Sequence, residues 1–131
     1  MNKNNVIKVM AQGFYGNRTA TEVNRENVDR FILGYMDDSL KVTEKVDRTI
    51  VNIPNTDNIV IVYNKYEEEY ELNKKERLFN ENGYELKPLV VIPEENIKLY
   101  SRCIACRMNE HGELESLNDE DFEDIMNYLA E

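Results

Sequence analysis

The strongest constraint on the fold is the run Ile59-Val-Ile-Val-Tyr63, in which four consecutive residues are β-branched. β-Branched side chains restrict the backbone and favour extended structure, so this run predicts a strand. Leu40–Ile53 alternates well enough for a second strand, and Pro54-Asn-Thr-Asp-Asn58 between the two is a turn sequence. Two strands joined by so short a loop most simply form an antiparallel hairpin.

Further strands are predicted on both sides of this hairpin. Residues 5–15 form a first strand, and the polar segment Glu67–Glu71 lies at a strand end or edge, where charge discourages edge pairing. Asn82-Gly83 signals a short turn with positive φ at both central positions. Strands are expected to follow it at Leu86–Ile92 and at Ile97–Met108, where the chain turns again.

A first helix is expected to begin after Asn24, which is a good N-cap residue. Val23 and Val28 occupy the two positions of a hydrophobic staple around this cap. The apolar stripe of this helix has the spacing i, i+3, i+4, i+7 and consists of Val28, Phe31, Ile32 and Tyr35.

The final helix is the best-specified element of the sequence. Asn118 is its N-cap, Leu117 and Phe122 form the staple pair, and Asp121 occupies the position of a capping-box acid. The predicted buried stripe consists of Phe122, Ile125, Met126 and Leu129. The opposite face consists of Glu120, Glu123, Asp124 and Asn127.

These elements predict an α+β fold in which a mainly antiparallel sheet is packed by two amphipathic helices. A chain of 131 residues fits one domain, and no linker or repeat divides residues 1–131. An acidic C-terminal turn and helix, residues 109–131, belong to the same domain.

The formal net charge is −10, but it is not evenly distributed. Residues 108–131 carry nine acidic side chains and no Lys or Arg, whereas residues 1–107 have a net charge of −1. Bulk binding to nucleic acids or anionic membranes needs many Lys and Arg residues, so the sequence excludes direct binding of that kind. This charge distribution remains compatible with a small anionic ligand that is held by a few arginines.

The cellular location is expected to be the cytoplasm. The longest apolar runs, such as Pro88–Pro93, are far shorter than the ~20 residues of a membrane span. The N-terminal Met-Asn-Lys-Asn-Asn has no apolar region typical of a signal peptide. Two cysteines three positions apart give no disulfide framework, as expected for a reducing compartment.

The C-terminal half contains a characteristic order of motifs. Val62-Tyr-Asn64 ends a strand, Arg77-Leu-Phe-Asn-Glu-Asn-Gly83 and Tyr84-Glu85 form a turn, and Met108-Asn-Glu-His-Gly-Glu-Leu-Glu-Ser-Leu-Asn-Asp-Glu-Asp121 leads into the last helix. This order resembles a family of small proteins of unknown function carried by phages, prophages and plasmids. The resemblance covers about residues 30–131 and rests on turn and cap signals. The chain departs from the pattern in its longer N-terminal half and at Lys75-Glu76.

The resemblance implies a mobile-element context and no established activity. Accessory proteins of this size in such elements commonly act on host processes or on host defence. The implied location is therefore the cytoplasm of a bacterial host cell.

Signatures of metal or catalytic chemistry are weak. Cys103-Ile-Ala-Cys106 lacks the second ligand pair of a structural zinc site, and two residues three apart on a strand face opposite ways. His111 is the only histidine, and it lies in a turn rather than beside a serine in a nucleophile-elbow setting. No phosphate-binding glycine motif is present. We therefore expect no metal, no cofactor and no enzymatic activity, and a small hydrolase or transferase that uses His111 is the disfavoured alternative.

Gly13-Phe-Tyr-Gly-Asn-Arg18 is the candidate segment for binding a small molecule. Its aromatic side chains can stack on a base, its glycines let backbone N–H groups approach a phosphate, and its polar side chains can donate to anionic oxygens. The candidate ligand-binding residues are Phe14, Tyr15, Asn17, Arg18, Arg77, Arg102 and Arg107. The alternative is a hairpin-like turn whose aromatic residues belong to the core.

The acidic C-terminal region supports a second hypothesis. Closely spaced carboxylates on a helix can imitate a phosphate backbone and occupy a nucleic-acid-binding groove of a host protein. The candidate partner-binding residues are Glu120, Glu123 and Asp124. The alternative is an ordinary solvated face of an amphipathic helix.

The leading hypothesis is a non-enzymatic phage or mobile-element protein that counters host defence by sequestering a nucleotide-derived immune signal. A homo-oligomer would help it, because a subunit interface can enclose a ligand. The alternative hypothesis is an acidic inhibitor that mimics nucleic acid and binds a basic host protein.

Overall fold

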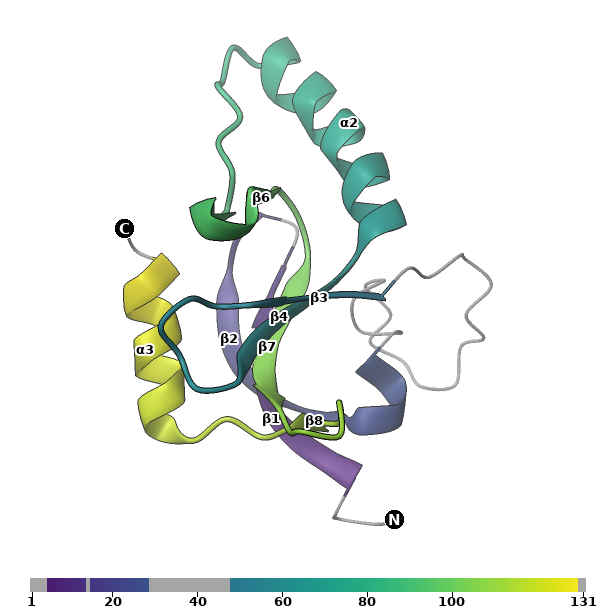
Figure 1. Ribbon diagram of the computed structural model, residues 1–131. Helices are drawn as coiled ribbons and strands as arrows, with labels where there is room; N and C mark the ends of the chain where they lie inside the picture. Colours follow the sequence, from purple (N-terminus) through teal and green to yellow (C-terminus); the bar gives the residue numbers. More distant parts are fainter. Residues whose placement is uncertain (1–4, 14, 29–47, 130–131) are drawn as a thin grey trace.

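The computed structural model describes residues 5–13, 15–28 and 48–129 (Figure 1). The elements are β1 (Val6–Gln12), β2 (Arg18–Asn24), η2 (Arg25–Asn27), β3 (Arg48–Asn52), β4 (Ile59–Asn64), α2 (Lys65–Glu81), β5 (Val90–Ile92), η3 (Pro93–Glu95), β6 (Ile97–Leu99), β7 (Cys103–Met108), β8 (Leu114–Glu115) and α3 (Asp119–Leu129). Neither helix in these ranges is long and apolar enough to cross a membrane.

The main sheet is antiparallel and has the strand order β2-β1-β7-β4-β3. β8 extends it by pairing with the last residues of β7. Ala105 lies at its centre, opposite Met10 of β1 on one side and Ile61 of β4 on the other. β5 and β6 form a separate two-stranded sheet. The predicted α+β fold with a mainly antiparallel sheet is therefore confirmed.

The central strands are buried on both faces, which explains their continuous apolar sequences. Ile59 and Ile61 of β4 pack into one core, together with α3 and the β5–β6 sheet. Val60 and Val62 pack into a second core on the other face. The predicted hairpin between β3 and β4 is confirmed, with Val51 opposite Ile61.

α2 continues directly from β4 and extends beyond the end of the sheet, and the chain returns beside it to β5 and β6 (Figure 1). The assignment of Glu67–Glu71 to a strand end is therefore wrong, because these residues lie within α2. The side chain of Asn64 caps the helix by accepting a hydrogen bond from the backbone N–H of Tyr66, at 3.2 Å. Lys and Glu are good helix formers, so the polar sequence continues the helix once it is capped.

Asn82-Gly83 ends α2 rather than joining two strands. Only Gly83 has a positive φ, of +74°, whereas Asn82 has a φ of −101°. The backbone N–H of Tyr84 donates to the carbonyl of Phe79 at 2.9 Å, which closes the last turn of the helix. The same sequence serves as a helix end because the preceding element is a helix and not a strand.

Three other predicted strands differ in length. β1 ends at Gln12 rather than at residue 15. Only Val90–Ile92 of the predicted strand Leu86–Ile92 is extended in a sheet, since Pro88 has no N–H to donate. Ile97–Met108 is divided into β6 and β7, which belong to different sheets.

β2 is a strand that the sequence analysis did not predict, because Arg18–Asn24 has few apolar residues at alternate positions. The first predicted helix begins as expected, since the side chain of Asn24 accepts from the N–H of Glu26 at 3.0 Å. The rest of that helix and residues 40–47 of the predicted strand Leu40–Ile53 lie outside the described residues.

α3 matches its prediction closely. Asn118 and Asp121 form the capping box, with reciprocal backbone to side-chain hydrogen bonds of 2.8 and 3.0 Å. Ile125 is fully buried, and the rest of the predicted stripe packs partly buried against the same core. The predicted polar residues Glu120, Glu123, Asp124 and Asn127 are exposed.

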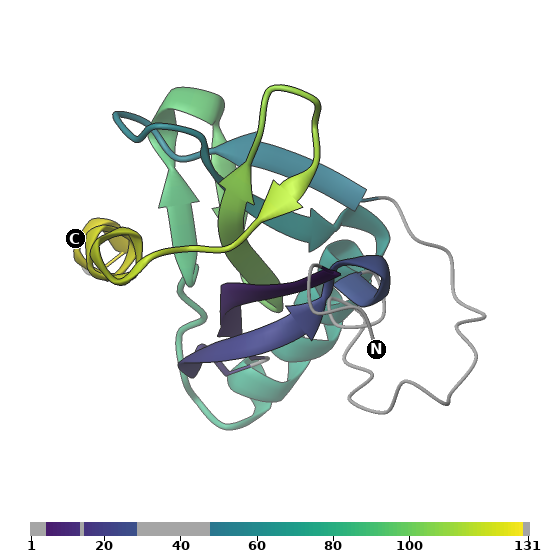
Figure 2. The same cartoon turned by 90° about the horizontal axis from the view of Figure 1, so that it is seen from below.

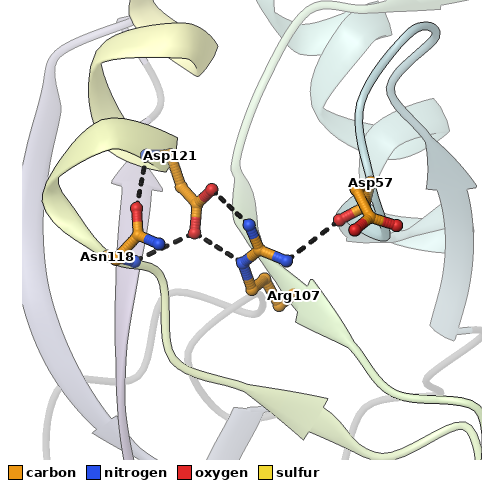
Figure 3. A network of polar contacts seen from close by, with 4 residues as sticks. All are labelled: Asp57, Arg107, Asn118 and Asp121. Carbon is orange, nitrogen blue, oxygen red and sulfur yellow. Dashed lines mark hydrogen bonds and ion pairs between the residues drawn. The ribbon is translucent and has the colours of Figure 1, made fainter.

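Asp121 also fastens α3 to the sheet, which the capping pattern did not indicate. Arg107 of β7 donates from Nε and Nη2 to the two oxygens of Asp121, at 2.5 and 2.6 Å (Figure 3). Nη1 of Arg107 donates to the carbonyl of Asp57 at 3.1 Å, so the same guanidinium also holds the turn between β3 and β4. Hydrogen bonding from Arg107 lowers the pKa of Asp121, against the opposing effect of burial.

We expect Asp121→Asn to lower the free energy of unfolding at pH 7 by about 2 kcal/mol, because it removes a charged bidentate pair. A pKa that is lower in the folded state makes the ion pair stabilising above the unfolded-state value near ~4. This contribution disappears as the pH falls through the folded-state pKa of Asp121. Urea denaturation should therefore show a difference between wild type and variant at pH 7 that shrinks at pH 3. Glu123→Gln on the exposed face is the control, and an equal loss in both variants would contradict the assignment.

Candidate ligand-binding site

The β1–β2 hairpin ends in a tight turn between Gly13 and Asn17. The N–H of Gly13 donates to the carbonyl of Asn17 at 2.9 Å, and the N–H of Gly16 donates to the carbonyl of Gly13 at 3.1 Å. Gly16 has a φ of +93°, and a Cβ at this position would lie 2.8 Å from Leu89. A Cβ on Gly13 would lie 2.4 Å from Oδ1 of Asn17. Gly16 is thus required by the turn and its packing, whereas the atom nearest to a Cβ on Gly13 belongs to the exposed side chain of Asn17, which can move.

Gln12 and Arg18 are opposite each other at the end of the hairpin. Gln12 is buried, and its Nε2 donates to the carbonyl of Ser101 at 2.7 Å. Its Oε1 accepts from Nε of Arg18 at 2.9 Å, while Nη2 of Arg18 donates to the carbonyl of Leu89 at 2.6 Å. The guanidinium of Arg18 is therefore held by β1 and by the segment before β5, which are far apart in the sequence.

Glu71 of α2 is buried against the segment between β6 and β7. One carboxylate oxygen accepts from the hydroxyl of Ser101, and the other accepts from Nη1 of Arg102. The ion pair with Arg102 is partly shielded, since the side chains of Arg102 and Glu71 are 30% and 8% exposed. These contacts satisfy a carboxylate that would otherwise be costly to bury.

Lys75 lies one helical turn after Glu71 and is only 2% exposed. Its Nζ donates to the carbonyl of Tyr100 at 2.6 Å. The same atom lies 5.8 Å from the ring centroid of Tyr15 and 5.9 Å from that of Phe79, within the range of cation–π attraction. A lysine from α2 is thus placed beside an aromatic residue of the hairpin turn.

These contacts define one group of side chains, which we call the polar cluster. It consists of Gln12, Arg18, Glu71, Lys75, Ser101 and Arg102. It contains three cationic side chains and one carboxylate, so its formal charge is +2 at neutral pH. Tyr15, whose side chain is 68% exposed, adjoins it through Lys75. An excess of positive charge beside an exposed aromatic ring is suited to an anionic, aromatic ligand.

The structure brings together three of the predicted ligand-binding residues, namely Tyr15, Arg18 and Arg102. Phe14 lies outside the described residues. Asn17 is exposed in the same turn. The hairpin-like turn, which was the alternative for this segment, is confirmed for the backbone, but Tyr15 does not belong to the core.

Arg77 and Arg107 lie apart from the cluster. Arg77 is exposed on α2, and its position two residues from Lys75 directs it about 200° around the helix axis. Arg107 lies in β7, five residues beyond Arg102, which directly precedes the strand; five extended residues span about 17 Å. Its hydrogen bonds to Asp121 and Asp57 give it a structural role (Figure 3).

Sequence patterns did not indicate four residues of the polar cluster, namely Gln12, Glu71, Lys75 and Ser101. A signal for two of them was present in Asn64-Lys-Tyr-Glu67, which has the spacing of a capping box and predicts a helix after β4. In a helix, Glu71, Lys75 and Phe79 fall on one face at intervals of four residues. Apolar periodicity does not reveal this pattern, because Glu71 and Lys75 on the buried face are polar.

The cysteines and the histidine lie elsewhere. Cys103 and Cys106 are buried on opposite faces of β7, as predicted, so the two thiols do not converge on one metal ion. Burial raises the pKa of Cys106 to about 12, against the effect of Arg48, and keeps this thiol protonated. His111 is exposed in the turn before β8, beside Glu110. Within the described ranges, no group of three His, Cys, Asp or Glu side chains is arranged to hold a metal.

Searches with known family models, curated proteins and solved structures found no significant match to this chain. The resemblance to small phage and plasmid proteins therefore stays a prediction from the sequence.

Glu71→Gln should lower the free energy of unfolding by about 3 kcal/mol, because it removes the buried carboxylate that pairs with the partly buried guanidinium of Arg102 and accepts from Ser101. Glu76→Gln, an exposed position on the same helix, is the matched control and should change it by less than about 0.5 kcal/mol. Chemical denaturation at neutral pH measures both. If the two variants lose the same stability, the polar cluster is not a stabilising network.

Proposed function

We propose that this protein is a non-enzymatic binding protein whose ligand is a nucleotide-type molecule held at the polar cluster and the adjoining hairpin turn. In the mobile-element context suggested by the sequence resemblance, its role is to sequester a nucleotide-derived signal of host defence. The observation that carries the proposal is the formal charge of +2 beside the exposed ring of Tyr15.

Each candidate residue has a distinct role in the proposed site. Tyr15 provides a ring face on which a base can stack. Asn17 is exposed beside it and provides amide donors and an acceptor. Arg102, 30% exposed, provides charge-assisted donors for phosphate oxygens. Arg18 contributes mainly its charge, because its Nε and Nη2 are already hydrogen-bonded to the fold.

Tyr15→Ala should abolish ligand binding while leaving the fold intact, because the side chain is largely exposed. Tyr84→Ala is the matched control, since Tyr84 is 69% exposed at the far end of α2. The probes are cyclic adenine and guanine dinucleotides and linear adenosine nucleotides, with inorganic phosphate as the control for simple anion binding. A ligand at 100 times its Kd should raise the melting temperature of wild type and Tyr84→Ala by about 10 °C. The absence of any shift across the panel would refute the proposal.

A second candidate function is inhibition of a basic host protein by α3. The specific observation in its favour is that Glu120, Glu123 and Asp124 are all exposed, whereas Asp121 is neutralised within the fold by Arg107. All the charged side chains on the exposed face of α3 are therefore carboxylates. Such a surface attracts a nucleic-acid-binding groove through charge.

For this second function, neutralising Glu120, Glu123 and Asp124 together should remove binding to a basic host protein. Neutralising Glu76, Glu81 and Glu94, which are exposed elsewhere, is the matched control. Binding of wild type should weaken at least ~10-fold between low and physiological salt, because the attraction is screened. Affinity chromatography of host extract at two salt concentrations measures this, and a partner retained equally by both triple variants would exclude the acidic surface as the binding site.

A further inference from the structure

β2 forms one end of the main sheet and pairs, within the described residues, with β1 alone (Figure 2). The hydrogen bond from Gly13 to Asn17 sets the alternation of bonded pairs along this hairpin. The backbone N–H and C=O groups of Thr19, Thr21 and Val23 therefore form hydrogen bonds with β1. The backbone N–H and C=O groups of Arg18, Ala20 and Glu22 point away from it.

The outer edge of β2 is complementary to itself. The sequence from Arg18 to Glu22 is Arg-Thr-Ala-Thr-Glu, with opposite charges at equal distances from Ala20. If a second copy pairs antiparallel about Ala20, Arg18 lies opposite the partner's Glu22, and Thr19 lies opposite the partner's Thr21. Opposite charges and threonine pairs are both favourable across antiparallel strands. In the same arrangement, the outward backbone N–H and C=O groups of Arg18, Ala20 and Glu22 face those of the second copy.

The side chains at this edge are accessible and correctly placed. Thr19, Ala20 and Glu22 are exposed, and the small Ala20 lets the two strands approach. Arg18 is oriented by its bonds to Gln12 and Leu89, and its Nη1 has no partner in the described part of the chain. Glu22 lies opposite Lys8 on β1, but the described residues show no ion pair between them.

Edge strands that avoid association commonly carry charges that repel a second copy, such as lysines. β2 instead carries one charge of each sign, so that two copies attract each other. A hollow of about 360 Å³ lies beside the edge, between Ala20 and Thr21 of β2 and Leu117 and Phe122 near α3. Its lining also includes Lys8, Glu22 and Asp119, so both positively and negatively charged side chains lie near the β2 edge.

We propose that the protein forms a two-fold symmetric dimer in which β2 of one protomer pairs antiparallel with β2 of its partner and joins the two sheets into one. The interface is isologous, as a two-fold axis requires. Its formation does not require a ligand, although it shares Arg18 with the proposed ligand-binding site.

Sedimentation of the full chain over a range of concentrations tests the dimer. Wild type should associate reversibly to a dimer and no further. Ala20→Pro should weaken association at least ~10-fold, because it removes an outward N–H while the bonds to β1 remain. Glu22→Arg should do the same by setting arginines against each other, whereas Glu94→Arg, at an exposed position on η3, should not.

A charge swap identifies the pairing directly. Glu22→Arg and Arg18→Glu should each be monomeric alone and should form a heterodimer when mixed, because both cross-strand pairs then have opposite charges. Arg18→Glu also loses contacts to Gln12 and Leu89, so its melting curve is recorded first. If it does not fold, Ala20→Pro and Glu22→Arg decide the question. A wild type that stays monomeric at hundreds of micromolar, or a dimer insensitive to both variants, would overturn the proposal.

Discussion

The fold depends on the burial of β4 and β7 on both faces. Ile61 and Ala105, paired across these strands, belong to one core, while Val62 and Ile104 belong to the other. Backbone groups buried on both sides must be hydrogen-bonded by neighbouring strands, so β1 and β3 are required at their flanks. The positions of α3, the β5–β6 sheet and the β1–β2 hairpin follow from this central pair.

Polar groups complete the structure where the apolar cores end. At one end of β7, Arg107 joins α3 to the β3–β4 turn through Asp121 and Asp57 (Figure 3). At the other end, Glu71 and Lys75 of α2 are buried among Ser101, Arg102 and Tyr100. Such networks are costly when incomplete, which makes their geometry specific. The second network has excess positive charge and lies beside an exposed tyrosine, and it is therefore the basis of the functional proposal.

Local signals predicted the elements whose stabilising contacts are close in sequence. The Asn118–Asp121 capping box and the buried position of Ile125 are of this kind. Asn82-Gly83 was identified as a chain reversal, but its structural context was wrong, because a glycine with positive φ ends a helix as readily as it forms a hairpin. The polar segment after Asn64 was misassigned because its helix buries Glu71 and Lys75 rather than an apolar stripe.

The sequence by itself determined that an antiparallel sheet and a capped C-terminal helix form, since β-branched runs and capping residues act within a few positions of the chain. It also separated the acidic C-terminal region from a nearly neutral body. Only the tertiary structure decided which arginines belong to one hydrogen-bonded network. Arg18 and Arg102 are linked through Gln12, Ser101 and Glu71, because β1, α2 and the segment before β7 converge. Arg107 is directed to Asp121 by its position near the other end of β7. Contacts between residues more than eighty positions apart, such as Gln12 and Ser101, leave no local pattern in the sequence.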